Sequence, residues 1–187
     1  PPRAAFFQEQ LQNYLVLTRK LNKDPFALQG SYAGAMGLPQ FMPSSYLRLA
    51  VSASPPATPN LWQADDAILS VAHYFADEGW QRNGIIAVPA QVEGTTYKHI
   101  FSTKRSTLFT VGQLSRYGVT PTYYLPKQTR VNLVMLPTAQ GPQFWLALHN
   151  FYVIMRYNES TYYAMAVAQL GDAIAKQRYR THARVYG

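Results

Sequence analysis

The run Gly30-Ser-Tyr-Ala-Gly-Ala-Met-Gly-Leu-Pro-Gln-Phe-Met-Pro-Ser-Ser-Tyr46 is the most informative part of the sequence. Residues 30–43 contain three glycines and two prolines beside apolar and amide side chains. Glycine and proline at this density interrupt helices and strands, so we expect a shaped loop with little regular structure. Directly after it, Ser44 and Ser45 are suitable N-caps for a short helix that ends at about Ala50.

Amphipathic helices are expected on both sides of this loop. One should run from about residue 3 to residue 23, because apolar side chains recur there at helical spacing before Asp24-Pro25 ends the helix. Its stripe comprises Phe7, Leu11, Tyr14, Leu15, Thr18 and Leu21. After a surface loop over residues 52–60, a second helix is predicted from Asp65 to Gly79. Its buried stripe is expected to consist of Ile68, Val71, Ala72 and Phe75.

Between about residues 85 and 136 the pattern changes to short β-favouring runs separated by Gly, Pro and Thr. These runs are 85–88, 108–111 and 131–136. Helical spacing returns at residues 161–176. We therefore predict a mainly α protein of the α+β class. Residues 1–81 and 141–187 would form its helical core, and residues 82–140 a small β-containing subdomain.

The composition of the 187-residue chain limits the kinds of protein it can be. No apolar stretch reaches the roughly 18 residues that a membrane-spanning helix needs. The absence of cysteine excludes disulfides, thiol catalysis and thiolate metal sites. Lys and Arg number 17 against 9 Asp and Glu, and the net charge of +8 favours polyanionic partners. Nucleic acid, anionic lipid headgroups and the carboxylate-bearing peptides of a bacterial wall all remain open at this point.

Several kinds of chemistry have no support in the sequence. The four histidines lie far apart without an HxxxH-type partner, so we expect no metal site. Phosphate-binding loops and the nucleophile elbow of α/β-hydrolases are missing, and we expect no cofactor. A glycosidase would need a carboxylic acid in an apolar pocket. Each carboxylate here fits a helix face or a helix end instead, including Glu9 and Glu159.

Three parts of the sequence resemble the B-type lytic transglycosylases, glycoside hydrolase family 103. They are the run 30–46, the segment Ser70-Val-Ala-His-Tyr-Phe75 with Gly79-Trp80, and the segment Asn150-Phe-Tyr-Val-Ile-Met-Arg-Tyr-Asn158 with Ser160-Thr161 and Ala164-Met-Ala-Val167. The resemblance extends from residue 1 to about residue 176 and is weakest over 84–140. It implies that the helical core is lysozyme-like and that the β-containing part is a small insertion.

The resemblance also implies a reaction on peptidoglycan, the cleavage of the β-1,4 bond between N-acetylmuramic acid and N-acetylglucosamine. One glutamic acid first protonates that bond and then takes the proton of the muramic C6 hydroxyl, which closes on C1 and leaves a 1,6-anhydro end. In this family the glutamate stands upstream of the segment that begins here. We therefore expect no catalytic residue within this chain.

The site residues that the resemblance carries over bind substrate. Ser31 would bind the catalytic carboxyl or the substrate acetamido group, and Gln40 would hydrogen-bond the sugar. The others would line the subsites or face the cleavage point, and they are Met36, Phe41, Tyr74, Tyr152, Tyr157 and Asn158. The structural alternatives are a turn-forming serine, a glutamine that only bonds its own loop, and tyrosines that belong to the core.

The expected partner is the glycan strand of peptidoglycan in the periplasm, for an enzyme that could be an outer-membrane lipoprotein. The positive charge adds the inner leaflet of the outer membrane and other cell-wall enzymes as candidate partners. The rival hypothesis is a non-catalytic peptidoglycan-binding module. Nucleic acid is not expected, because basic and aromatic residues form no recognisable motif. Some relatives carry a calcium loop where Ser52–Pro59 stand here with three prolines and no carboxylate, so no calcium is expected there.

Overall fold

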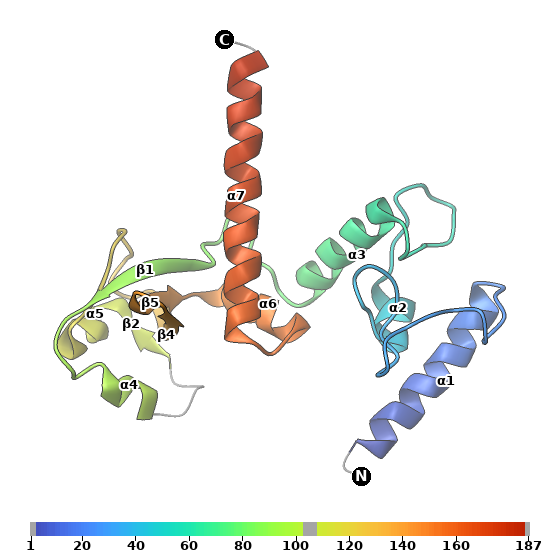
Figure 1. Ribbon diagram of the computed structural model, residues 1–187, viewed down its shortest axis with the longest axis horizontal. Coiled ribbons are helices and arrows are strands. Elements are labelled where there is room, and N and C mark those ends of the chain that lie inside the picture. Colours follow the sequence, from blue (N-terminus) through green and yellow to red (C-terminus); the bar gives the residue numbers. More distant parts are fainter. Residues whose placement is uncertain (1–2, 103–107, 186–187) are drawn as a thin grey trace. The chain divides into compact units, whose positions relative to one another are not determined.

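The computed structural model describes the chain at residues 3–102 and 108–185. The chain forms two compact units, Pro1–Glu78 and Gly79–Gly187. The first unit holds the helices α1 (Ala4–Lys20), α2 (Pro43–Leu49) and α3 (Ala64–Asp77) (Figure 1). The second unit contains, in order, β1 (Ala87–Val92), α4 (Lys98–Ser102), β2 (Phe109–Thr110), α5 (Val111–Leu114), a 3-10 turn (Ser115–Tyr117), β3 (Val119–Pro121), β4 (Arg130–Thr138), β5 (Gly141–Ala147), α6 (His149–Tyr157) and α7 (Thr161–Val185).

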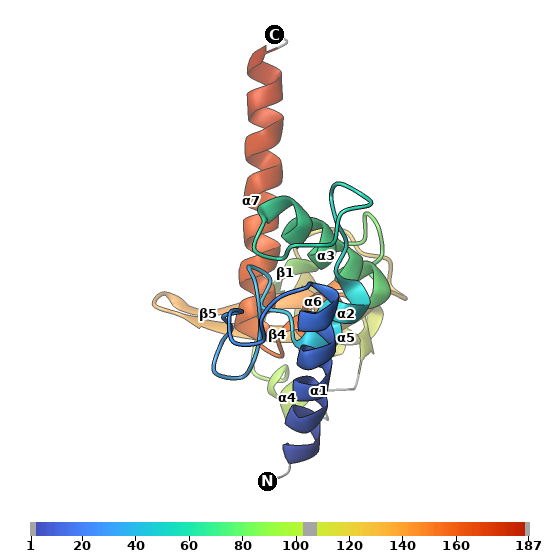
Figure 2. The ribbon, with the colours of Figure 1, turned by 90° about the vertical axis from the view of Figure 1, so that its right-hand side faces the viewer.

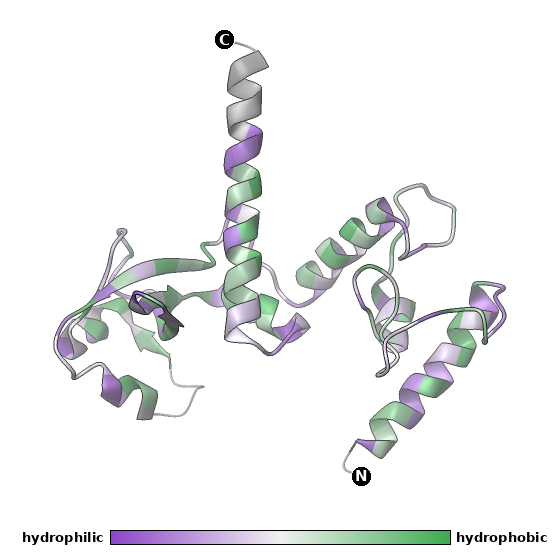
Figure 3. Ribbon diagram, viewed as in Figure 1, coloured by the Kyte–Doolittle hydropathy of each residue, from purple (hydrophilic) through white to green (hydrophobic). Residues whose placement is uncertain are grey.

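Helix α1 forms where periodicity predicts it, but only part of the predicted stripe turns inward, with Thr18 buried at 2% exposure. Hydrophobic and hydrophilic residues alternate along it (Figure 3). Phe7, Leu11 and Leu15, three members of the predicted stripe, are 41%, 59% and 51% exposed, whereas Gln10 is buried. The physical reason is a hydrogen bond, because Gln10 Oε1 accepts the N–H of Ser44 at 3.1 Å in the first turn of α2. The prediction that Ser44 and Ser45 cap α2 is therefore wrong.

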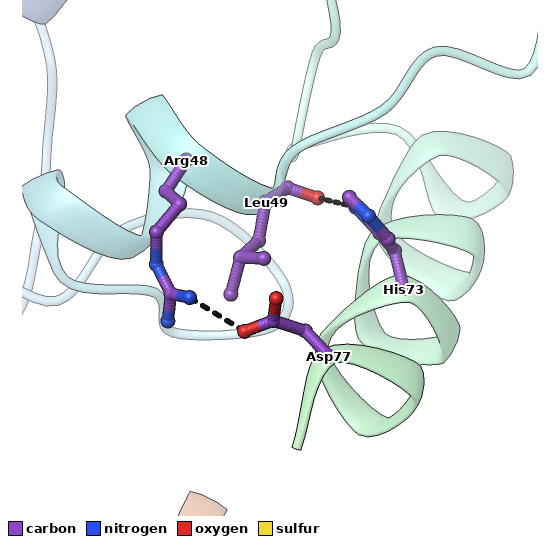
Figure 4. A network of polar contacts seen from close by, with 4 residues as sticks. All are labelled: Arg48, Leu49, His73 and Asp77. Atoms are coloured by element: carbon purple, nitrogen blue, oxygen red, sulfur yellow. Dashed lines mark hydrogen bonds and ion pairs between the residues drawn. The ribbon is translucent and has the colours of Figure 1, made fainter. Parts of the chain in front are cut away.

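Helices α2 and α3 are joined by two polar contacts near their C-terminal ends. Arg48 donates to Asp77 at 2.5 Å, and the Nδ1–H of His73 donates to the carbonyl of Leu49 at 3.0 Å (Figure 4). Both members of the ion pair are largely exposed, with side-chain exposures of 57% and 38%. Solvent screening limits what such a pair contributes to stability, so this contact orients the helices more than it stabilises them.

The buried side of α3 combines Ala67 with two polar residues where the sequence predicts an apolar stripe. Ile68 is 67% exposed and Ala72 is also exposed, which corrects the predicted stripe at two positions. Asp66 and Ser70 are buried in their place, at 6% and 0% exposure. The loop beside α3 donates three backbone N–H groups to these two side chains, from Val51 to Ser70 Oγ at 3.0 Å and from Ala53 and Asn60 to Asp66 at 2.7 Å. An apolar stripe could not accept these hydrogen bonds.

The second unit is built around a five-stranded antiparallel sheet with the order β2-β4-β5-β1-β3. The predicted β-favouring runs correspond to β1, β2 and β4, while β3 and β5 were not expected. On one face of the sheet lies an apolar cluster that includes Val88, Leu114, Val131 and Leu146. Because β5 begins at residue 141, the sheet extends past the boundary drawn at residue 140, and the division into core and subdomain stays a prediction.

Helices α6 and α7 follow the sheet and are tied to the segment that precedes it. Asn150, 1% exposed, accepts the N–H of Gln81 at 2.9 Å and donates to the carbonyls of Gln81 and Gly84 at 2.8 and 3.0 Å. Helix α7 is long and extends well beyond the sheet of its own unit (Figures 1 and 2). Over the described residues, no helix combines the length and hydrophobicity that crossing a bilayer requires.

Candidate functional site

The glycine-rich run folds into a compact loop held by its own backbone. Met36 exchanges hydrogen bonds with Phe41, its N–H donating at 2.9 Å and its carbonyl accepting at 3.0 Å. The N–H of Ser31 donates to Ala35 at 2.8 Å, and Ser31 Oγ accepts the N–H of Ala35 at 3.1 Å. Met36 and Phe41 are buried at 2% and 3% exposure, while Ser31 and Gln40 are exposed. The loop therefore presents its hydroxyl and amide outward on an apolar base.

Two backbone features fix the position of the exposed amide. Gly37 has a φ of +70°, and the N–H of Leu38 donates to the carbonyl of Leu61 at 2.8 Å, which draws the loop against the chain before α3. Gln40 itself has a φ of 53°, in the left-handed region of backbone conformation that residues other than glycine rarely adopt. Its Nε2 donates to the carbonyl of Gly37 at 2.9 Å. This conformation is strained, and residues of this kind concentrate at functional sites.

An aromatic contact connects the loop to α3. The rings of Phe41 and Tyr74 lie 5.9 Å apart at an angle of 49°. Tyr74 is half-buried, and its ring also meets the ring of Phe75, with centroids 6.1 Å apart. The structure thus brings Phe41, the neighbour of Gln40 in the loop, into contact with Tyr74, while the binding roles of these residues stay predictions.

Ser31 opens onto a hollow of about 280 Å³ between α1 and the loop. Its walls include the apolar side chains of α1 that do not enter the core, and its lining includes Phe7, Leu11, Tyr14, Ser31 and Met36. The hydroxyl of Tyr14 donates to the carbonyl of Pro25, which orients that ring on the hollow's rim. A hydroxyl group at the edge of an apolar hollow is a common arrangement for orienting a ligand.

The predicted residues of the second unit lie in two places. Tyr157 stacks on Tyr163, with ring centroids 6.3 Å apart and planes inclined by 2°, and the exposed Asn158 follows it at the end of α6. Tyr152 instead lines a hollow of about 360 Å³ beside β4. Sequence reasoning missed Tyr163. Its position six residues after Tyr157, across the Asn-Glu-Ser-Thr turn, is the signal that could have found it.

Asp66 is a carboxylate with a shifted pKa, and its role is structural. Asp66 Oδ1 accepts the N–H of Ala53 and Oδ2 accepts that of Asn60, both at 2.7 Å, and these two hydrogen bonds lower the pKa of Asp66. A general acid needs the opposite shift, so Asp66 is unsuited to protonate a leaving group at neutral pH. Beside it, burial raises the pKa of Tyr46, whose hydroxyl donates to Pro59 at 2.7 Å.

Metal binding has no support from the described side chains. Within residues 3–102 and 108–178, no three His, Asp or Glu residues gather closely enough to hold an ion. The segment before Leu61, where some relatives carry a calcium loop, contributes no carboxylate, and both oxygens of Asp66 already accept backbone N–H groups. These donors do not fit calcium.

Amide, hydroxyl and tyrosine side chains at the edge of partly apolar hollows form a common arrangement for binding and orienting a ligand. The comparisons define the class further. The chain belongs to the Transglycosylase SLT domain family, whose model matches residues 1–172. This assignment confirms the family resemblance found in the sequence.

Individual relatives agree with the family assignment. The chain is 44% identical over 178 residues to membrane-bound lytic murein transglycosylase B of Escherichia coli strain K12, covering 95% of this chain and 48% of the relative. The chain therefore spans about half the length of this curated relative. It also matches the structure of the E. coli lytic transglycosylase Slt35 in complex with bulgecin A, with a TM-score of 0.86 and 42% identity over 96% of this chain and 56% of that one.

A more distant match is SltB3 of Pseudomonas aeruginosa in complex with NAG-anhNAM-pentapeptide. Its TM-score is 0.78, with 28% identity over 91% of this chain and 46% of that one. Together with Slt35, these structures confirm the predicted fold class, a mainly α, lysozyme-like architecture with a β-containing insertion.

Proposed function

We propose that this chain is part of a lytic transglycosylase that cleaves the β-1,4 bond between N-acetylmuramic acid and N-acetylglucosamine in peptidoglycan and leaves 1,6-anhydromuramic ends. The family and the relatives' names support the class of reaction. The complex of SltB3 with NAG-anhNAM-pentapeptide supports the anhydro product, since that ligand carries such an end in its name. The chain covers 48% of the E. coli relative's length.

The observation that carries the position of the site is the strained backbone of Gln40. A glutamine at a φ of 53° is less favourable than glycine would be there, yet its amide is exposed at the tip of a loop whose base is buried. The hydrogen bond to Gly37 uses one amide proton and leaves the second proton and the carbonyl oxygen for a ligand. In our proposal these groups hydrogen-bond the sugar.

The other predicted residues support the substrate around Gln40. Ser31, whose Oγ accepts one N–H, keeps its own proton for a carboxyl or acetamido oxygen. Tyr74, which is half-buried, offers the exposed part of its side chain. Met36 and Phe41 are too buried for more than a small contact, so their larger part is to hold the loop in place.

In the second unit, Tyr157 and Asn158 are proposed to bind substrate near the cleavage point. The stacking on Tyr163 fixes the plane of the Tyr157 ring, so that its hydroxyl keeps one direction. Tyr152, which lines a hollow beside β4, would contribute more peripherally. The proposed helical core over 1–81 and 141–187 and the β-containing subdomain over 82–140 belong to the same proposal.

The catalytic acid is proposed to be a glutamate upstream of residue 1, as the family resemblance implies. A single acid can suffice because the nucleophile, the C6 hydroxyl, belongs to the substrate and is held close to C1. The acid donates its proton to the glycosidic oxygen, and the resulting carboxylate accepts the proton of the C6 hydroxyl. No carboxylic acid is consumed, so the acid is ready for the next bond.

The proposed location is the periplasm, where the glycan strands of the wall are the substrate. The name of the E. coli relative supports an association with a membrane, and a lipid anchor on the outer membrane is the form we propose. A net charge of +8 would strengthen the attraction to the anionic wall and to the membrane's inner leaflet. Other cell-wall enzymes are candidate partners on the same grounds.

The test is mass spectrometry of the soluble products formed from purified murein sacculi by two proteins, the 187-residue chain and a longer form that includes the upstream polypeptide. Anhydro-muropeptides from the longer form alone would support both the reaction and the upstream acid. Products from the 187-residue chain would contradict the upstream acid and make Glu9 or Glu159 the next candidate. Binding to sacculi without products from either protein would favour the non-catalytic peptidoglycan-binding module.

A further inference from the structure

The sheet of the second unit has an aromatic residue on the face that its apolar cluster leaves free. Along β5, Phe144 and Leu146 pack into the cluster, so Trp145 between them points to the opposite face. The strand register sets Trp145 opposite Pro89 on β1 and Val134 on β4. The indole ring therefore lies near the middle of the sheet and not at its edge.

A hollow of about 370 Å³ lies between this face and α7. Its volume falls in the range of roughly 300 to 1,000 Å³ that ligand pockets occupy. Trp145 lines it together with the small residues Gly84, Ala87, Ala168 and Gly171. Protein interiors normally close such gaps with side chains. Helix α7 lines this hollow with Met165, Gln169 and Asp172, and Ala168 and Gly171 leave the space between them open.

Gly171 leaves part of this space open, and its presence lowers the stability of α7. It lies inside α7, where glycine destabilises a helix relative to alanine. A Cβ atom built on it would meet no described atom within 4 Å, so the packing of the described chain does not require glycine. A group that enters from outside and approaches the helix backbone would require it.

We propose that this hollow is a second carbohydrate site, which binds one sugar residue of a glycan strand. The flat indole of Trp145 suits the C–H face of a pyranose ring. Gly171 has no side chain and Ala168 has only a methyl group, so there is room beside them for the pyranose ring. Gln169 and Asp172 stand at the exposed rim, where an amide and a carboxylate can hydrogen-bond to hydroxyl groups. Lys176 holds the Asp172 carboxylate at 2.6 Å.

The choice of a sugar as ligand rests on the proposed function. A polymer that contacts the protein at a second site is bound more tightly overall, because the second contact forms at a high effective concentration. With this site, the second unit would help to hold the glycan strand at a place separate from Tyr157 at the end of α6.

The test is a titration of the 187-residue chain with the tetramer of β-1,4-linked N-acetylglucosamine, followed by NMR of the indole N–H signals. The chain has three tryptophans, and Trp145→Phe identifies the signal of interest. We expect the Trp145 signal to move with saturation. Gly171→Ala should weaken this binding by at least about fivefold, since its methyl group enters the ligand's space, while it raises the unfolding temperature by about 2 °C.

Two matched variants complete the test. Gln169→Ala should weaken the titration of the Trp145 signal, whereas Gln12→Ala, at an exposed helical glutamine of the first unit, should not. A stationary Trp145 signal, or a Gly171→Ala variant that is stabilised with unchanged affinity, would overturn the proposal and assign the hollow to protein packing. The anhydro-product assay is independent of this signal, so a failure of the proposed reaction can be told from a failure of this site.

Discussion

Replacing Gly37 by alanine should strongly destabilise the first unit. A Cβ at this position would lie 2.7 Å from both the Cβ and the carbonyl oxygen of Leu61 and 2.9 Å from its carbonyl carbon. Leu61 is 0% exposed and its carbonyl accepts the N–H of Leu38, so it cannot easily move away. The left-handed backbone adds strain of its own, because φ is +70°.

The magnitude follows from these two effects. A left-handed alanine costs about 1–2 kcal/mol, and inserting a methyl group into a packed site costs about 1–3 kcal/mol. Gly37→Ala should therefore lower the free energy of unfolding by about 2–5 kcal/mol. Gly34→Ala is the matched control, since Gly34 has a φ of +86° but nothing within 4 Å of a Cβ. Its loss should be only about 1–2 kcal/mol.

The assay is urea denaturation, in which the fluorescence of Trp62 monitors unfolding of the first unit. Trp80 and Trp145 belong to the second unit and would be replaced by phenylalanine in every variant, so that the signal reports the first unit alone. Both glycine variants restrict the unfolded chain equally, and that contribution cancels in the comparison. Equal losses for Gly37→Ala and Gly34→Ala, within about 0.5 kcal/mol, would refute the contact with Leu61.

Four further outcomes are expected. Gln40→Gly should change the free energy of unfolding by less than about 1 kcal/mol, because relief of left-handed strain offsets the lost hydrogen bond, yet weaken binding to sacculi about tenfold in a pelleting assay. Asp66→Asn should be destabilising at neutral pH. Since folding lowers the pKa of Asp66 below its ordinary 3.8, the stabilisation is complete above that pH and disappears as the pH falls through the lower, folded value, where urea curves of the two proteins should converge. Arg48→Ala should cost less than about 1 kcal/mol in the same measurement, as the pair is exposed. Chelation with EDTA should leave the melting temperature unchanged, because Asp66 anchors the loop before α3 with hydrogen bonds alone.

Periodicity located the main helices but not the faces that they bury. The helical spacing of α1, α3 and α7 is a local property. The observed ranges of α1 and α3 agree with it, while α7 extends past the predicted end at residue 176 to Val185. Which side turns inward depends on distant partners, and polar groups decided it twice. Gln10 is buried because α2 lacks its own cap, and Asp66 is buried because a loop needs acceptors. Neither requirement is visible from hydropathy.

The sequence predicted residue types for the candidate site, whose binding roles stay predictions, but it did not predict the site's geometry. The sequence pointed to a hydroxyl and an amide in the glycine-rich loop, and both are exposed there. The left-handed backbone of Gln40 depends on how the loop closes against Leu61, which is a tertiary contact. Strand β3 was missed because it has only three residues, and β5 because it begins with Gly141-Pro142, a pair that is typical of a break between elements.

The strand order of the second unit affects how this protein can be made. Strand β1 pairs with β5, so that Ala87 lies opposite Ala147, which is far from it in the sequence. Sheets whose strands are so far apart in the sequence fold slowly. A ribosome releases β1 well before β5, and until then one edge of β1 is open to pairing with other chains. Pro89 has no N–H to donate, and its carbonyl accepts the N–H of Thr122, so the donor that it lacks belongs to the edge that faces β3. The edge of β1 that pairs with β5 therefore keeps its donors, and the nascent chain depends on the arrival of β5 to cover them.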